Sequence, residues 1–161
     1  MNVATILAAG QGKRFGADVP KQFIEVLGKP VLAYTLETFQ RSPEIDAIQI
    51  VCQPAYEDRI IEIVRDYRID KIRWITAGGD TCPVSIRNGV NALRSSLSVD
   101  DIIVLHMGVS PLVSLEDIAS AISLCEKKAA VSPCTPYASA WPRAAMSDGR
   151  TGTRRRRSTS S

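Results

Sequence analysis

With 161 residues, of which 45% are hydrophobic, the chain is long enough for one domain with a buried core. The net charge of +3 lies entirely in the last 24 residues, which hold six arginines and one aspartate, whereas residues 1–137 hold fourteen Lys or Arg against sixteen Asp or Glu. A nearly neutral body argues against a nucleic-acid-binding domain, and no apolar run approaches the roughly 20 residues that a membrane-spanning helix needs.

The first half of the chain alternates apolar runs with amphipathic segments. The apolar run over residues 3–9 predicts a buried strand, and a glycine-rich loop follows it. The next segment contains a short extended piece and a turn signal at residues 28–30. The spacing of Leu32, Leu36 and Phe39 then predicts a helix over residues 31–42, which Pro43 ends.

The same alternation continues from residue 46 onward. Further strands are predicted over residues 46–54, 72–79 and 101–108, with a fifth beginning within 129–137. Helices are predicted over residues 56–69, 83–97 and 114–128; the first of these should bury Ile60, Ile61, Val64 and Tyr67. Ser114 is the expected N-cap of the last helix, with Asp117 in the capping-box position. The pattern predicts an α/β fold, an open and mostly parallel sheet with helices on both faces.

The composition changes after Tyr137. Residues 138–161 consist mainly of Ala, Ser, Thr, Gly and Arg, including four consecutive arginines, and we expect them to be disordered. One interpretation is a tail that binds nucleic acid or a membrane surface. We favour a non-native end, from a frameshift or a vector, on a domain of residues 1–137 that is truncated within its fifth strand.

Cysteine use and the N-terminus indicate a cytoplasmic protein. Met1 and Asn2 lead directly into the apolar run without the basic segment of a signal peptide. The four cysteines include no C-x-x-C pair, so we expect reduced thiols and neither a zinc site nor a disulfide framework.

Three loops should meet at the carboxyl edge of the predicted sheet, where open α/β sheets bind their ligands. They are residues 7–23, 78–85 and 106–111. The first contains glycines 10, 12 and 16, which allow close backbone approach, and the cations Lys13, Arg14 and Lys21. Phosphate is the natural partner of such a set, although glycine spacing alone also fits an ordinary turn and G-K-[ST] is absent.

The first loop, "LAAGQGKRFGADVPKQF", resembles the L-A-A-G-x-G-x-R-x-G…P-K-Q-F/Y signature of the cytidylyltransferases that act on 2-C-methyl-D-erythritol 4-phosphate or ribitol 5-phosphate. "LGKPVLAYTLETF", "GGDTCPVSIRNGV" and "VLHMGVSPLV" resemble later segments of that family, in the same order. The resemblance runs from about Val3 to Pro136 and implies a Rossmann-like nucleotidyltransferase fold.

The resemblance also implies an activity: CMP is transferred from CTP to a sugar-alcohol phosphate, and pyrophosphate leaves. It assigns Arg14 and Lys21 to transition-state stabilisation and Mg²⁺ to the bound CTP. It assigns substrate contacts to the remaining loop residues: Leu7, Ala8, Ala9, Gly10, Gly12, Lys13, Gly79, Asp80, Thr81 and Ser85.

The sequence departs from the family pattern at three positions. Cys82 and Ser110 stand where the family has arginine, and Met107 stands where it has the aspartate expected to hold Mg²⁺, a role that methionine cannot fill. His106 matches the family's histidine, but a lone histidine at a strand end is more often structural than catalytic. Asp80 and Asp18 are the remaining acids of the three loops.

The family's later segments, which supply the acceptor pocket and a dimerisation arm, have no counterpart after Tyr137. Nucleotide binding without turnover, by an inactive remnant of the family, therefore stays open as an alternative. A nucleic-acid-associated protein led by Arg154–Arg157 is the third hypothesis, and the oligomeric state is left open.

Overall fold

The computed structural model describes residues 1–10 and 19–128. All of these residues belong to one compact unit, Met1–Val131, whereas the predicted fifth strand and the tail lie outside the described residues. The centre of the unit is a sheet in which every neighbouring pair is parallel. Its strands, in the order β5-β4-β1-β6, are Ile72–Ala77, Ala47–Cys52, Asn2–Ala8 and Ile102–Met107.

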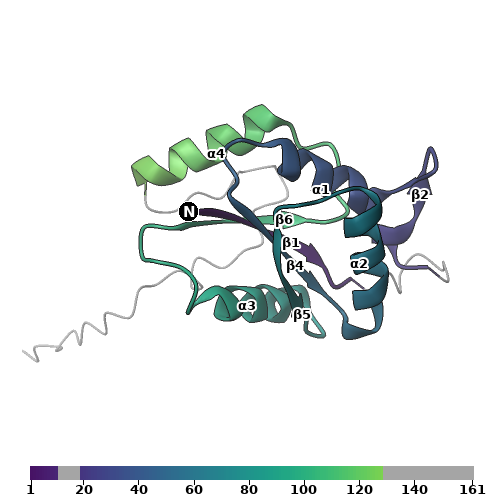
Figure 1. Cartoon of the computed structure of the whole chain (residues 1–161). Helices are drawn as coiled ribbons and strands as arrows, with labels where there is room; N and C mark the ends of the chain where they lie inside the picture. Colours follow the sequence, from purple (N-terminus) through teal and green to yellow (C-terminus); the bar gives the residue numbers. More distant parts are fainter. Residues whose placement is uncertain (11–18, 129–161) are drawn as a thin grey trace, which may run out of the picture. The chain divides into compact units, whose positions relative to one another are not determined.

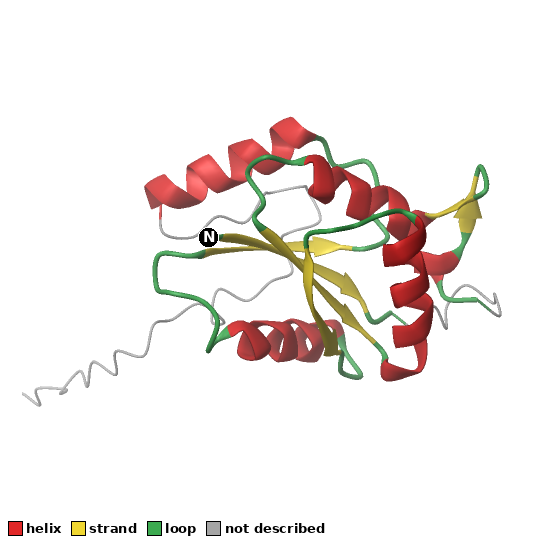
Figure 2. Cartoon of the chain, in the orientation of Figure 1, coloured by secondary structure: helices red, strands yellow, loops and turns green. Residues whose placement is uncertain are grey.

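Helices cover both faces of this sheet, as the alternation predicted (Figure 1, Figure 2). Three of them contribute to the larger core cluster on one face: α1 (Val31–Arg41), α2 (Glu57–Asp66) and α4 (Leu115–Lys128). The fourth, α3 (Cys82–Leu93), packs on the opposite face, where Leu93 joins Val3 and Ala47. The Rossmann-like α/β fold is therefore confirmed for the described residues.

The central strand β1 is buried on both faces because helices lie above and below it. Ala4, Ile6 and Ala8 point into the larger cluster, and Val3 points toward α3. This double burial explains why residues 3–9 form a continuous apolar run rather than an alternating one.

The predicted core of α1 is confirmed. Leu32, Leu36 and Phe39 are fully buried in the larger cluster. Burying a side chain of this size stabilises the fold by about 1.5–3 kcal/mol.

The prediction for α2 was wrong in two respects. Ile61 is 48% exposed and Ile63 is 2% exposed, so Ile63 and not Ile61 is buried beside Ile60. The helix also ends three residues earlier than expected, because Arg68 adopts a left-handed backbone with φ of 51°. The amide of Ile69 donates to the carbonyl of Val64 at 2.9 Å, which closes a Schellman turn.

The segment between β1 and α1 contains a short 3-10 helix, η1 (Lys21–Phe23), and a hairpin of β2 (Glu25–Val26) and β3 (Lys29–Pro30). The turn was predicted at residues 28–30, but Leu27 and Gly28 form it, because these two have the positive φ values. A second 3-10 helix, η2 (Pro54–Tyr56), precedes α2. Helix α3 ends at Leu93, four residues before the predicted end.

The capping box of α4 is confirmed. The Ser114 hydroxyl accepts from the amide of Asp117 at 3.0 Å, and the Asp117 carboxylate accepts from the amide of Ser114 at 3.0 Å. The Ser114 hydroxyl also donates to the Asp117 carboxylate at 2.7 Å, and this bond, together with that from the Ser114 amide, holds the pKa of Asp117 below its usual value. No helix among the described residues is long and apolar enough to cross a membrane.

Candidate functional site

The three predicted loops meet at the carboxyl edge of the sheet. The amide of Gly78 donates to the carbonyl of Cys52 at 2.7 Å, and the amide of Gly108 donates to the carbonyl of Leu7 at 2.9 Å. The side-chain amide of Gln53 joins the first two loops, donating to the carbonyl of Gly79 at 3.2 Å and to that of Ala9 at 3.4 Å. Segments that are far apart in sequence, such as Leu7 and Gly108, therefore form one continuous rim.

The backbone emerges from the core over the first four predicted contact residues. Leu7 and Ala8 are buried, Ala9 is half-buried and Gly10 is exposed. A Cβ atom on Gly10 would meet no described atom within 4 Å, so no described side chain fills the space beside its backbone. The predicted residues Gly12, Lys13 and Arg14 lie outside the described residues.

The far end of the first loop returns to the same place through η1. The Phe23 amide donates to the carbonyl of Pro20 at 2.9 Å, and the Phe23 ring lies 5.3 Å from the ring of Tyr56. The buried side-chain amide of Gln22 donates to the carbonyl of Ala8 at 2.8 Å and to that of Gly10 at 3.2 Å. Lys21, half-buried, directly precedes Gln22, so its backbone lies near the end of β1.

The second loop packs tightly against the first. A Cβ atom on Gly78 would lie 2.4 Å from that of Ala9, so only glycine permits this approach. The buried hydroxyl of Ser85 accepts from the amide of Gly79 at 3.0 Å and lies 3.3 Å from its carbonyl oxygen. Ser85 thus shapes the turn at Gly79 in addition to any contact with a ligand.

The remaining predicted residues of the second loop, Asp80 and Thr81, are exposed and precede the N-terminus of α3. The Thr81 hydroxyl accepts from the amide of Val84 at 3.5 Å as the N-cap of that helix. The positive end of the helix dipole faces this edge of the sheet, which favours negative ligands.

His106 in the third loop has a structural environment. Its Nε2 atom lies 2.9 Å from the carbonyl oxygen of Ser110, to which it donates, and its ring lies 5.0 Å from that of Phe39. Burial lowers the pKa of the imidazole, and the hydrogen bond to Ser110 opposes this only in part. The neutral ring therefore braces the loop, in agreement with the structural interpretation of the sequence.

The described residues do not fit a metal ion held by the protein itself. They include no group of three His, Cys, Asp or Glu side chains arranged to bind a metal. Met107 is 43% exposed at the end of β6, next to Leu7 in the sheet, and offers no hard oxygen ligand. Asp80 is the one carboxylate in the described parts of the three loops.

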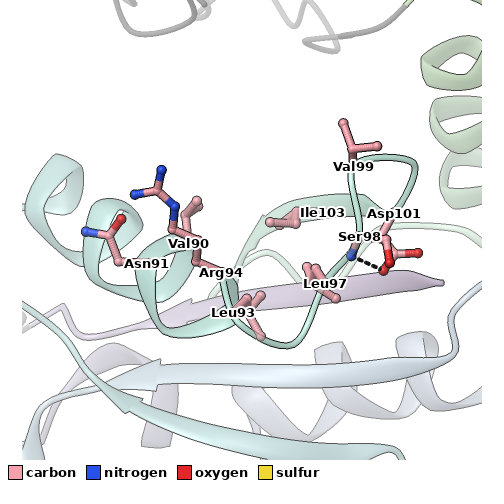
Figure 3. A pocket seen from close by; sticks show the side chains of 9 residues that line it. All are labelled: Val90, Asn91, Leu93, Arg94, Leu97, Ser98, Val99, Asp101 and Ile103. Atoms are coloured by element: carbon pink, nitrogen blue, oxygen red, sulfur yellow. Dashed lines mark hydrogen bonds between the residues drawn. The ribbon is translucent and has the colours of Figure 1, made fainter. Parts of the chain in front are cut away.

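A groove of about 330 Å³ lies at the opposite, amino edge of the sheet (Figure 3). Its lining is mainly apolar side chains from the end of α3, the loop that follows it and the start of β6, among them Val90, Leu97 and Ile103. Its acidic residue, Asp101, is already bonded to the amide of Ser98 at 2.8 Å and to the N-terminal ammonium group. No set of charged groups converges in the groove, so the rim at the carboxyl edge remains the better candidate.

Sequence reasoning missed the two glutamines of the rim. Gln22 stands within the quoted P-K-Q-F motif without an assigned role, and Gln53 was not singled out. For Gln53 the available signal was position, because a polar residue directly after a buried strand lies at the carboxyl edge; nothing in the spacing singled out Gln22.

Comparison with known proteins gives one consistent family. The profile of the 2-C-methyl-D-erythritol 4-phosphate cytidylyltransferase family matches residues 2–159. A ribitol-5-phosphate cytidylyltransferase of Lacticaseibacillus paracasei is 38% identical over 137 residues, which are 85% of this chain and 58% of that protein. A 2-C-methyl-D-erythritol 4-phosphate cytidylyltransferase of Porphyromonas gingivalis is 40% identical over 133 residues, 83% of this chain and 57% of the relative.

The solved structures agree with the fold. A 4-diphosphocytidyl-2C-methyl-D-erythritol synthase from Anaerococcus prevotii superposes with a TM-score of 0.63 and 34% identity, covering 78% of this chain and 51% of that structure. The chain thus spans a little over half the length of the relatives that it matches.

Proposed function

Because the chain belongs to the 2-C-methyl-D-erythritol 4-phosphate cytidylyltransferase family, we propose that it is built to transfer CMP from CTP to a sugar-alcohol phosphate. An oxygen of the acceptor phosphate attacks the α-phosphorus of CTP. The bond from that phosphorus to the oxygen bridging to the β-phosphorus breaks, and pyrophosphate leaves. Named relatives of both substrate types match at similar identity and coverage, so the proposed acceptor is methylerythritol 4-phosphate or ribitol 5-phosphate.

One observation carries the proposal: both ends of the glycine-rich loop lie at the carboxyl edge, joined by Gln22, beside the open backbone of Gly10. A triphosphate placed there would meet the backbone of residues 8–10 and the cations Arg14 and Lys21. Phosphoryl transfer needs mainly positioning and stabilisation of charge, which such groups supply.

In this proposal Asp80, Thr81 and the Gly79 backbone contact the base and ribose, and Mg²⁺ arrives bound to CTP. A cytoplasmic location is part of the proposal and rests on the sequence alone.

The test is calorimetric titration of the full chain with CTP and Mg²⁺, followed by a pyrophosphate-release assay with each acceptor. We expect binding in the micromolar to millimolar range, and Lys21→Ala should weaken it about tenfold or more. Lys127→Ala, an exposed lysine near the end of α4, is the matched control and should bind as the wild type does. Absence of CTP binding at millimolar concentration would refute the proposal.

A second function is favoured by Met107, which replaces the family's acidic residue: a nucleotide-binding protein without turnover. The two functions differ in one result. CTP binding without pyrophosphate release from either acceptor supports the second, and any release excludes it.

A further inference from the structure

We infer that Gln22 is a positioning residue, which fixes Lys21 and the rest of η1 against the end of β1; this inference rests on the proposed function. Gln22 is 1% exposed, although glutamine is usually a surface residue. Its side chain does not pack for apolar contact alone, because its amide nitrogen bonds two carbonyls that precede the loop.

The two bonds act across the loop. Ala8 and Gly10 stand where the loop leaves the sheet, and Gln22 stands just after it returns. The side chain therefore links η1 to the backbone of Ala8 and Gly10. Removing it leaves two carbonyls without this donor and frees the chain on either side of Lys21.

Backbone hydrogen bonds within η1 shape the turn around Lys21. Within η1, the amide of Ile24 donates to the carbonyl of Lys21 at 3.2 Å, and that of Phe23 donates to Pro20. These bonds shape the turn but do not fix it to the sheet. Gln22 provides the polar link from the turn to β1, and the Phe23–Tyr56 contact secures its other side.

The experiment is a double-mutant cycle on CTP binding by the full chain. Gln22→Met keeps the length and burial of the side chain and removes the donor, and we expect the Kd for CTP to rise about fivefold to tenfold. Because Gln22 acts through Lys21, the same substitution in a Lys21→Ala background should change the Kd by less than about twofold. An unchanged Kd in Gln22→Met, or an equal factor in both backgrounds, overturns the inference.

Gln49 supplies the matched control. It is equally buried, and its amide donates to the carbonyl of Gly89 at 3.0 Å and to the hydroxyl of Thr76 at 2.9 Å, within the sheet and α3. Gln49→Met should lower stability and leave the Kd of the folded protein unchanged. A similar loss of CTP affinity in Gln49→Met would show that any buried amide matters, and would overturn a specific role for Gln22.

Hydrogen exchange separates this inference from the proposed function. Without any ligand, Gln22→Met should speed exchange of the Phe23 and Ile24 amides by about tenfold relative to amides of β4. Wild-type exchange rates at these two amides in Gln22→Met overturn the inference even if CTP binds. Absence of CTP binding by the wild-type protein overturns the proposed function instead. If Gln22→Met does not fold, Gln22→Asn, one methylene too short to reach both carbonyls, takes its place in both measurements.

Discussion

Gly10→Ala should weaken CTP binding without lowering the stability of the fold. A methyl group there would meet no described atom within 4 Å, and Gly10 does not have a positive φ, so the folded protein can accept alanine. Alanine restricts the unfolded chain more than glycine does. At a site whose backbone accepts alanine, this raises the free energy of unfolding by about 0.4–1 kcal/mol. The same methyl would occupy space that the proposal gives to the triphosphate. Crowding of this kind costs about 1–3 kcal/mol, which is roughly a fivefold to hundredfold rise in the Kd for CTP.

The assay pairs urea unfolding with calorimetric titration by CTP, and Gly78→Ala is the comparison. There the new methyl would lie 2.4 Å from the Cβ of Ala9, which cannot move without its backbone. Gly78→Ala should therefore lose both stability and CTP binding, whereas Gly10→Ala loses binding alone. The reasoning is wrong if Gly10→Ala binds CTP as tightly as the wild type, or if it unfolds as readily as Gly78→Ala.

Two further predictions concern stability. Arg68→Gly should raise the free energy of unfolding by about 0.5–1 kcal/mol. A left-handed residue other than glycine costs about 1–2 kcal/mol, but glycine also makes the unfolded chain more flexible, which offsets part of the gain. Thermal unfolding should show an increase of about 2–5 °C in Tm, and a decrease would contradict the assigned Schellman turn. Below its ordinary pKa of 6.5, His106 binds a proton more readily in the unfolded chain, since burial lowers its folded pKa. Stability should therefore fall as the pH drops below about 6.5, and His106→Asn should remove that part of the dependence in urea unfolding between pH 7.5 and 5.5.

The fold followed from the sequence wherever one periodicity dominated. The run over residues 3–9 could only be buried on both faces, and the alternation of strands and helices specified a parallel sheet. One error was to place Ile61 on the buried face of α2, although the i, i+3 helical spacing from Ile60 leads to Ile63. The other was the end of that helix, which the φ of Arg68 sets and which periodicity does not report.

The sequence predicted where the candidate site lies, but only some of the contacts between its loops. Because their loops follow parallel strands, Gly10, Gly79 and Lys21 are predicted at the carboxyl edge of the sheet. The observed hydrogen bonds between the loops agree with this prediction. The sequence could not reveal that Ser85 bonds the turn at Gly79, or that Gln22 spans the first loop. Both depend on side-chain reach between segments whose separation only the folded chain defines.

Met107→Asp tests what the family's missing acid would do. Met107 is 43% exposed and lies next to Leu7 in the sheet, so a carboxylate can stand there in water at little cost in stability. Without a divalent cation, the added negative charge repels the triphosphate, and the Kd for CTP should rise. With Mg²⁺, the carboxylate adds a hard oxygen ligand, and the Kd should fall below that of the wild type. The sign of the change should thus reverse when EDTA replaces Mg²⁺ in the same titration.

Leu105→Asp, on the same face of β6 and 45% exposed, is the control that adds a charge two residues away from the rim. A change of the same sign with and without Mg²⁺ would show that position 107 does not face the nucleotide's metal, and the interpretation of Met107 as a lost ligand would fail.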